Sequence, residues 1–187
     1  MRRLAEELGV TPMSLYRYVE SKDELLDVVV DALLEATRLP DELDNDWVAW
    51  LRESARRLRA LLVASPVARD VFTRRPVTTP AALRRMEASL RVLTGDGFSA
   101  EAALRAYAAV HVYTIGFAAL ETARANVRDP HGHNATGRYW HIFYGTLPKE
   151  DYPLLVELAP DLARFTTGEQ FEYGLEQLLQ GLGEEPR

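Results

Sequence analysis

The 187-residue chain contains no cysteine. A disulfide framework, a thiolate zinc site and a cysteine nucleophile are therefore excluded, and the cytoplasm is the expected compartment. Long apolar runs are also missing, because no stretch of signal-peptide length opens the chain and the longest run, Ala106 to Leu120, is interrupted by His111 and Gly116. Since a bilayer span needs roughly 20 apolar residues, we expect no membrane partner.

A surplus of positive charge is lacking as well. Lysine and arginine together number 22 against 28 aspartates and glutamates, which gives a formal net charge of -6. This balance argues against a protein that coats nucleic acids through a generally basic surface, although a small local patch remains compatible with DNA binding. The chain also shows no nucleophile elbow, zinc-binding helix or catalytic spacing of paired carboxylates, so we expect no enzyme.

Alternating apolar and polar residues of strand type are scarce, whereas helix start and stop signals occur along most of the chain. Hydrophobic residues make up 47% and charged residues 27% of the sequence, as is usual for a globular protein. The predicted fold class is all-α, in two parts that cover residues 1–39 and 46–183. The polar, acidic segment 40–45 is the expected linker.

Two short helices joined by a tight turn open the first part. The spacing predicts a helix over 2–8 that ends at Gly9, then a helix capped by Thr11 and opened by Pro12 that ends near residue 18 or 19. Ser21 and Glu24 match a capping box, which predicts a longer helix over 22–37. Two short helices around a glycine-containing turn are typical of a helix-turn-helix DNA-binding motif.

The second short helix carries side chains suited to a major groove. With Leu15 and Val19 turned inward, Ser14 and Arg17 are placed to reach base edges. Phosphate contacts are expected from Tyr16, Tyr18 and Lys22. The alternative is that the two tyrosines are ordinary surface aromatics of a small helical protein.

Three segments of this part resemble the helix-turn-helix of the tetracycline-repressor (TetR) family: Arg3 to Val10, Ser14 to Val19 and Ser21 to Leu26. The resemblance implies an all-helical homodimeric repressor of operator DNA whose C-terminal domain binds a small-molecule inducer. It also implies DNA contacts at the positions where family members touch the operator, which are Arg2, Thr11, Pro12, Ser14, Tyr16, Arg17, Tyr18 and Lys22. Family members carry one more helix before the point that matches Met1, so the resemblance implies an N-terminally incomplete head.

The second part contains further helix boundaries. Helix starts are predicted at Asp46, Ser65-Pro66, Thr79-Pro80 and Ser99, and the Ser99 helix, the longest, runs to about Asn126. Residues 128–137 are predicted to be a loop, 139–144 an aromatic segment of weak periodicity, 151–158 a short helix and 169–182 a terminal helix. The arginines between 52 and 91 are interpreted as solvated helix faces.

Aromatic and soft side chains of the second part are candidates for an apolar ligand cavity with a few polar groups. The candidates are Trp50, Phe72, Met86, Tyr107, His111, Phe117 and Trp140, with Tyr113 and Phe143 as further members. His111 is the strongest candidate, because an imidazole in an apolar helix needs a partner, either a ligand or a neighbouring Tyr or Thr hydroxyl. The alternative for every one of them is plain core packing.

The terminal helix carries an apolar stripe at helical spacing, made of Phe171, Leu175, Leu178 and Leu182. A single domain can bury such a stripe within itself. The resemblance favours a homodimer interface, in which this helix and the long Ser99 helix form a four-helix bundle with their copies.

Metal and cofactor sites are not expected. His131, His133 and His141 with Asp129 match no compact ligand spacing. The tetracycline-binding branch of the family uses a metal with its drug, but its ligand positions have no counterpart that we can place. A ligand-responsive repressor is therefore the first hypothesis, and a helical dimeric small-molecule-binding protein or enzyme without DNA-binding function is the alternative.

Overall fold

The computed structural model describes residues 1–7, 9–38, 46–127 and 137–184, and every regular element in these ranges is a helix. The elements follow one another as α1 (Arg2–Glu7), α2 (Pro12–Tyr16), α3 (Lys22–Glu35), α4 (Trp47–Ala64), α5 (Pro66–Arg74), α6 (Pro80–Gly95), α7 (Ala100–Ala125), α8 (Gly137–Gly145), α9 (Pro153–Glu157), α10 (Ala159–Leu162) and α11 (Gly168–Glu184). The all-α prediction is confirmed for these ranges. The linker predicted at 40–45 and most of the loop predicted at 128–137 lie outside the described residues.

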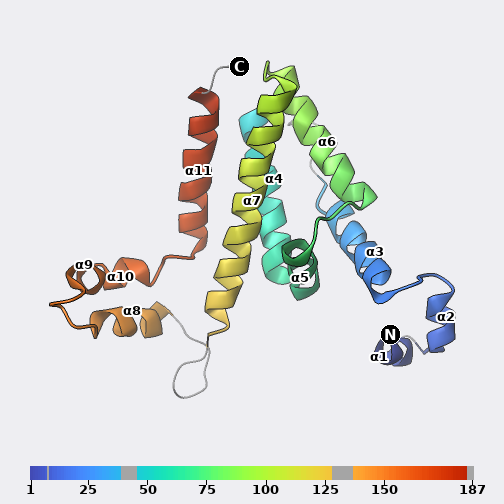
Figure 1. The fold of residues 1–187 in the computed structure, drawn as a ribbon, viewed down its shortest axis with the longest axis horizontal. Coiled ribbons are helices and arrows are strands. Elements are labelled where there is room, and N and C mark those ends of the chain that lie inside the picture. The colour runs from blue at the N-terminus through green and yellow to red at the C-terminus, as the bar shows by residue number, and fades with distance from the viewer. Residues whose placement is uncertain (8, 39–45, 128–136, 185–187) are drawn as a thin grey trace.

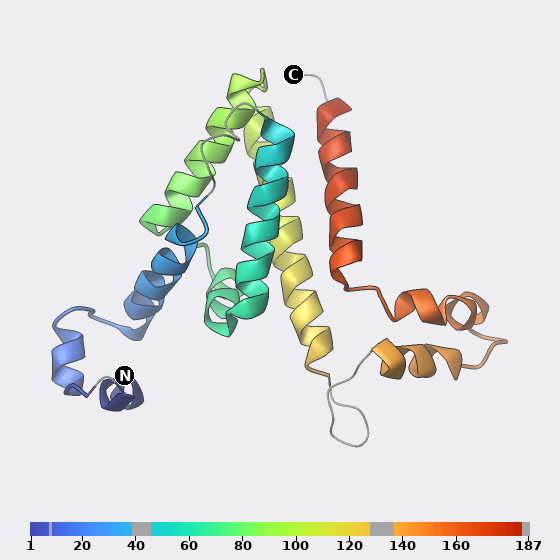
Figure 2. The ribbon, with the colours of Figure 1, turned by 180° about the vertical axis from the view of Figure 1, so that it is seen from behind.

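The long helices α4 and α7 form the centre of the molecule, with α5 and α6 on one side and α11 on the other (Figure 1). The view from behind shows the same order (Figure 2). We call α4 to α7 and α11 the body, α1 and α2 the head, and residues 137–165 the arm. α3 lies along α5 and α6 and leads out to the head, while the arm projects at the opposite end of the long axis.

Side-chain caps set most of the helix starts in the body. Asp46 and Ser99 each accept a hydrogen bond from the backbone N–H three residues on, at 2.9 and 3.1 Å. Thr79 differs from the prediction, because its hydroxyl makes no capping bond and is buried without a partner among the described residues. Asp31 of α3 caps α6 instead, and its carboxylate accepts the Ala81 N–H at 2.6 Å. A body helix thus begins on a side chain of the helix that leads to the head.

Two apolar clusters stabilise the body. The first lies where α4, α6, α7 and α11 meet, around the fully buried Leu51, Leu93 and Phe171. The second lies under α3 and α5, around Val30 and Leu62. Burial of one such side chain is worth about 1.5–3 kcal/mol. Because Val30 belongs to the second cluster, α3 is anchored in the body by packing as well as by hydrogen bonds.

The arm agrees with the sequence prediction in part. α9 lies within the short helix predicted at 151–158, whereas α8 makes a helix of the aromatic segment and α10 is a further short helix after the predicted one. Within these three helices only Ala159 is buried, and Leu154 is 66% exposed. Arg124 at the end of α7 holds the arm to the body, since its guanidinium donates to the Leu162 carbonyl at 2.6 Å and lies 4.4 Å from the centroid of the Trp140 ring.

By length and composition alone α7 is apolar enough to cross a membrane, a test that the core helix of a helical domain also passes. In this structure α7 packs against α4, α5, α6 and α11. Its buried side chains are Ala103, Ala106, Val110, Thr114 and Ala118. A central helix of a helical domain is apolar on several sides for the same reason, so the place of α7 accounts for its composition.

Candidate nucleic-acid interface and ligand cavity

The head is a pair of short helices joined at a glycine. Gly9 takes a φ of 65°, the left-handed conformation that glycine adopts without strain, and the predicted end of the first helix is thereby confirmed. The Val10 N–H donates back to the Ala5 carbonyl at 2.9 Å, which closes the turn. Ala5 and Val19 are buried, and Leu15 is half-buried, so these side chains form the inner face of the head.

The predicted start of α2 is also confirmed. Pro12 holds the first helical position, and the Thr11 hydroxyl accepts the Ser14 N–H at 3.2 Å. The Thr11 and Ser14 hydroxyl oxygens also lie 3.0 Å apart, within hydrogen-bond distance of each other. α2 ends at Tyr16, earlier than predicted, because the next residues form a turn that leads into α3. The two hydroxyls therefore define the N-terminal end of the helix that the motif presents to DNA.

Exposed aromatic and cationic side chains surround this end. Tyr16 and Tyr18 are 49% and 77% exposed, and the Arg17 guanidinium lies 5.9 Å from the centroid of the Tyr18 ring. Arg2 and Lys22 are exposed as well, whereas Ser14 is half-buried. Exposed arginine, lysine and tyrosine donors are the groups that contact phosphate oxygens in protein–DNA complexes.

The helix that follows starts on the serine cap expected from the sequence, while the glutamate of the predicted capping box bonds a different N–H. The Ser21 hydroxyl accepts the Glu24 N–H at 3.1 Å. The Glu24 carboxylate accepts the N–H of Glu20, one residue before the cap, rather than that of Ser21. The first turn of α3 is thereby closed directly beside the head.

Three acidic side chains of α3, each four residues after the last, bind the body. Asp27 pairs with Arg75 at 2.6 Å, and Glu35 pairs with Arg84 at 2.8 Å. Asp31 lies between them and caps α6. Because these contacts follow one face of α3, a movement of α3 relative to both the end of α5 and α6 has to break them together.

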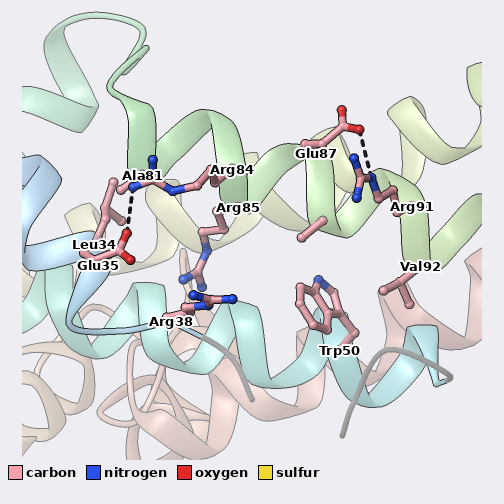
Figure 3. A pocket seen from close by; sticks show the side chains of 11 residues that line it. Leu34, Glu35, Arg38, Trp50, Ala81, Arg84, Arg85, Glu87, Arg91 and Val92 are labelled. Atoms are coloured by element: carbon pink, nitrogen blue, oxygen red, sulfur yellow. Dashed lines mark hydrogen bonds and ion pairs between the residues drawn. The ribbon is translucent and has the colours of Figure 1, made fainter. Parts of the chain in front are cut away.

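A cavity of about 450 Å³ lies between the end of α3, α4 and α6 (Figure 3). This volume falls within the ~300–1,000 Å³ of small-molecule sites. Trp50, predicted as a ligand residue, lines it, and its indole N–H donates to the Ser89 hydroxyl at 3.0 Å. The remaining walls are Leu34, Glu35, Arg38, Ala81, Arg84, Arg85, Glu87, Ala88, Arg91 and Val92.

The hollow next to His111 is too small for a ligand. It measures about 10 Å³, close to the space of a single water. His111 stacks on Tyr107 with ring centroids 5.1 Å apart, and the Tyr107 hydroxyl lies 3.5 Å from its Nδ1. The polar partner of the imidazole in this structure is therefore the tyrosine hydroxyl. Burial, followed by the charge of Arg85, lowers the pKa of His111, and burial raises the pKa of Tyr107.

The other predicted ligand residues do not gather around one cavity. Phe72 lies beside His111, with ring centroids 6.2 Å apart. Phe117 packs edge-on against Phe171 in the first core cluster, and Met86 is half-buried on α6 without lining either hollow. Trp140 belongs to the arm.

The terminal helix uses much of its apolar stripe inside the protomer. Phe171 and Leu175 are fully buried in the first cluster, and Leu178 and Leu182 are half-buried. Phe171 and Leu175 are thus packed against their own chain and present no surface to a partner.

A different apolar stripe is exposed on α7. Its members, four residues apart, are Leu104, Ala108, Val112, Gly116 and Leu120. Val112 is 67% exposed, and Leu104 and Leu120 are about half exposed at 46% and 48%. Sequence reasoning missed this stripe because α7 is apolar on nearly every side, so periodicity alone does not separate the faces.

The arginines of α4 differ from the solvated faces expected. Arg52 pairs with Glu176, and Arg56 pairs with Glu172, which attaches α4 to α11. These hydrogen bonds raise the pKa of both arginines, and the Arg52 bond lowers the pKa of Glu176. Arg59 pairs with Glu121 of α7 at 2.7 Å and lies 5.0 Å from the centroid of the Phe171 ring. Arg52, Arg56 and Arg59 follow one another at intervals of four and three residues, and this spacing already indicates that they share one face of α4.

No metal centre emerges from the part of the chain that the structure describes. Groups of three or more histidine, aspartate or glutamate side chains arranged to hold an ion are absent there. His141 is exposed on α8, and His131, His133 and Asp129 lie outside the described residues.

A helix-turn-helix head joined through one anchored helix to a helical body with a cavity defines a DNA-binding transcriptional regulator with a regulatory domain. The family described as "Tetracyclin repressor-like, C-terminal domain" matches residues 39–185. The chain belongs to this family, the tetracycline-repressor (TetR) family of transcriptional regulators.

Individual relatives agree with this assignment. The HTH-type transcriptional repressor DrrR1 of Streptomyces coeruleorubidus is 32% identical over 97% of this chain and 68% of that protein. The tetracycline repressor protein class C of Escherichia coli is 38% identical over 62% of this chain and only 53% of that protein. Among solved structures, the TetR family protein ActR of Streptomyces coelicolor in complex with actinorhodin has a TM-score of 0.79 at 28% identity, covering 97% of this chain and 85% of that chain.

Proposed function

We propose that this chain is a homodimeric transcriptional repressor that binds operator DNA through α2 and leaves it when a small molecule enters the body. The observation that carries the proposal is the position of α3 between the head and the cavity. It starts next to the head, ends beside the cavity and is bound to the body at Asp27, Asp31 and Glu35. A ligand that displaces the end of α3 therefore acts on the position of the head.

DNA contacts are assigned to residues of the head and of the start of α3. Arg17 is the candidate for base contacts, with Ser14 and Thr11 at the N-terminal end of α2. The phosphate contacts are assigned to Arg2, Tyr16, Tyr18 and Lys22, and Pro12 is assigned to the approach of α2 to the groove. A single short helix makes few base contacts, so useful specificity requires two heads on a two-fold symmetric operator.

The dimer is assigned to the exposed α7 stripe together with the outer face of α11. The two helices are neighbours, and Tyr173 on the outer face of α11 is 62% exposed. Two copies of this pair make a four-helix bundle, in which the half-buried Leu178 and Leu182 complete the edges. Cytoplasmic location follows from the role of a repressor on chromosomal DNA.

Operator binding by the full chain tests the proposal. The DNA is the region beside its own gene, and fluorescence anisotropy at two salt concentrations measures the affinity. We expect tight binding that weakens as salt rises, since each phosphate contact releases counterions. An affinity for the region beside the gene that is no higher than the affinity for unrelated DNA contradicts the proposal and favours a small-molecule-binding dimer without DNA function.

Substitution of two similarly exposed tyrosines tests whether the head binds the operator. Tyr16 and Tyr152 are similarly exposed, at 49% and 45%, but Tyr152 lies in the arm. Tyr16→Ala is expected to weaken operator binding by about tenfold, the value of one good phosphate or stacking contact. Tyr152→Ala serves as the control and is expected to bind like the wild type. Equal effects from the two substitutions contradict the assignment of α2.

A further inference from the structure

The cation of Arg85, a residue of the cavity wall, is hydrogen-bonded to backbone carbonyls. It projects from α6 toward α4 (Figure 3). Its guanidinium donates to the carbonyl of Ser54 and, at 3.5 Å, to that of Thr37. It forms no ion pair with a carboxylate of the described residues, whereas Arg84 and Arg91 at the same cavity are paired with glutamates. The Thr37 contact is at the limit of hydrogen-bond length, so part of the guanidinium remains available.

The surroundings of Arg85 make an anionic partner favourable. Burial lowers the pKa of Arg85 to about 10, and the nearby cation of Arg57 acts in the same direction. The side chain is still protonated near neutral pH, but it is poorly solvated for a cation. A carboxylate accepts two parallel hydrogen bonds from such a planar fork and neutralises its charge.

We propose that this cavity binds an aromatic carboxylate, with the carboxylate on the Arg85 guanidinium and the ring against Trp50. The hydrogen bond from Trp50 to Ser89 fixes the indole that forms the apolar wall. The inference rests on the proposed function and names the chemical class of the inducer.

The position of Arg85 also connects the ligand to the head. Thr37 is the second residue after the end of α3, and its carbonyl is one of the two acceptors of Arg85. A carboxylate that engages the fork competes with Thr37 for the same donors. Binding therefore loosens one of the contacts that hold the end of α3 to α6.

Two probes of the same shape test this inference by isothermal titration calorimetry on the full chain without DNA. 2-Naphthoate carries a carboxylate, and 2-naphthamide replaces it by a neutral amide. We expect the wild type to bind the naphthoate at least about tenfold more tightly, which corresponds to about 1.4 kcal/mol. No binding of naphthoate, or equal binding of the two probes, overturns the proposal.

Variants locate the anion. Arg85→Met is expected to remove the preference for naphthoate, and Arg85→Lys is expected to keep part of it, since the charge remains while the fork is lost. Arg105→Gln, an exposed arginine of α7, is the control and is expected to leave both affinities unchanged. A preference that persists in Arg85→Met overturns the assignment.

A third variant covers the case in which Arg85→Met fails to fold, as judged by circular dichroism. Ala88→Phe fills the cavity while Arg85 stays in place, and is expected to lower the affinity for both probes by at least about tenfold. Undiminished binding in a folded Ala88→Phe chain overturns the cavity as the site. Operator binding is measured separately, so a chain that binds operator but not naphthoate disproves only this inference, and one that binds naphthoate but no operator disproves the proposed function.

Discussion

Gly174 is the position of α11 where a single methyl group has the largest predicted effect. A Cβ atom there would lie 2.3 Å from the hydroxyl oxygen of Tyr113 and 2.9 Å from its Cζ. The tyrosine has little freedom to move, because its hydroxyl donates to the Phe171 carbonyl at 3.0 Å and its ring stacks on Phe171 with centroids 5.5 Å apart. Gly174→Ala therefore has to displace either the ring or α11.

The size of the effect follows from these contacts. In an unhindered helix, Gly→Ala stabilises by about 1 kcal/mol. At Gly174 this gain is opposed by loss of one hydrogen bond, about 1 kcal/mol, and by overpacking, about 1–3 kcal/mol, together with part of the ring stacking. We expect a net loss of about 1–3 kcal/mol, which lowers the melting temperature by roughly 3–9 °C in a chain of this size.

Gly181 provides the control on the same helix. No atom lies within 4 Å of a Cβ built there, so Gly181→Ala is expected to raise the melting temperature by about 2–4 °C. Thermal unfolding followed by circular dichroism, at one fixed protein concentration, measures both. Tyr113→Phe removes the atom nearest to the new methyl and is expected to restore part of the stability of Gly174→Ala. Equal shifts for Gly174→Ala and Gly181→Ala would refute the proposed contact between α7 and α11.

Three further outcomes are expected. If the proposed dimer forms through α7, Val112→Arg places a charge in that interface and should raise the dissociation constant by at least about tenfold in sedimentation velocity. Val67→Arg on the surface of α5 is the control and should leave the proposed dimer intact. Hydrogen bonds from Arg52 lower the pKa of Glu176, so this pair stabilises the fold above the ordinary pKa of 4.5, and the stabilisation is lost as pH falls through the lower pKa of the folded state. In urea titrations, the free energy of unfolding of Glu176→Gln should therefore fall less steeply with acid than that of the wild type. The difference should be less than about 1 kcal/mol, because the pair is partly exposed. Burial lowers the pKa of His111 below 6.5, so the unfolded chain takes up the proton first and the free energy of unfolding falls as pH drops below 6.5. His111→Gln should make this fall with pH less steep. An unchanged dependence of stability on pH would exclude His111 as its origin.

Local chemistry made the head predictable. The glycine at position 9, the Thr11-Pro12 start and the Ser21 capping box each act within about one helical turn, so their effect can be read from neighbouring residues. The same holds for the starts of α4, α5 and α7. Helix type and order in the described body therefore follow from the sequence.

Contacts between distant helices decided the rest. Asp31 replaces Thr79 as the cap of α6, and Arg85 is turned inward toward α4 rather than outward to solvent. Both results depend on the approach of α3, α4 and α6, which no local pattern contains. For the same reason the sequence placed the ligand cavity around His111, where Tyr107 and the packing of α4 against α7 leave almost no space.

Helix propensity and capping act over a few residues, so neighbouring residues are enough to predict helices for the described ranges, the two short helices of the head and the start of most helices. Which faces of those helices are buried depends on how distant helices pack together. Phe171 and Leu175 pack inside the protomer while Val112 is left on the surface, because the placement of α11 against α4 and α7 closes one apolar stripe and leaves the other open.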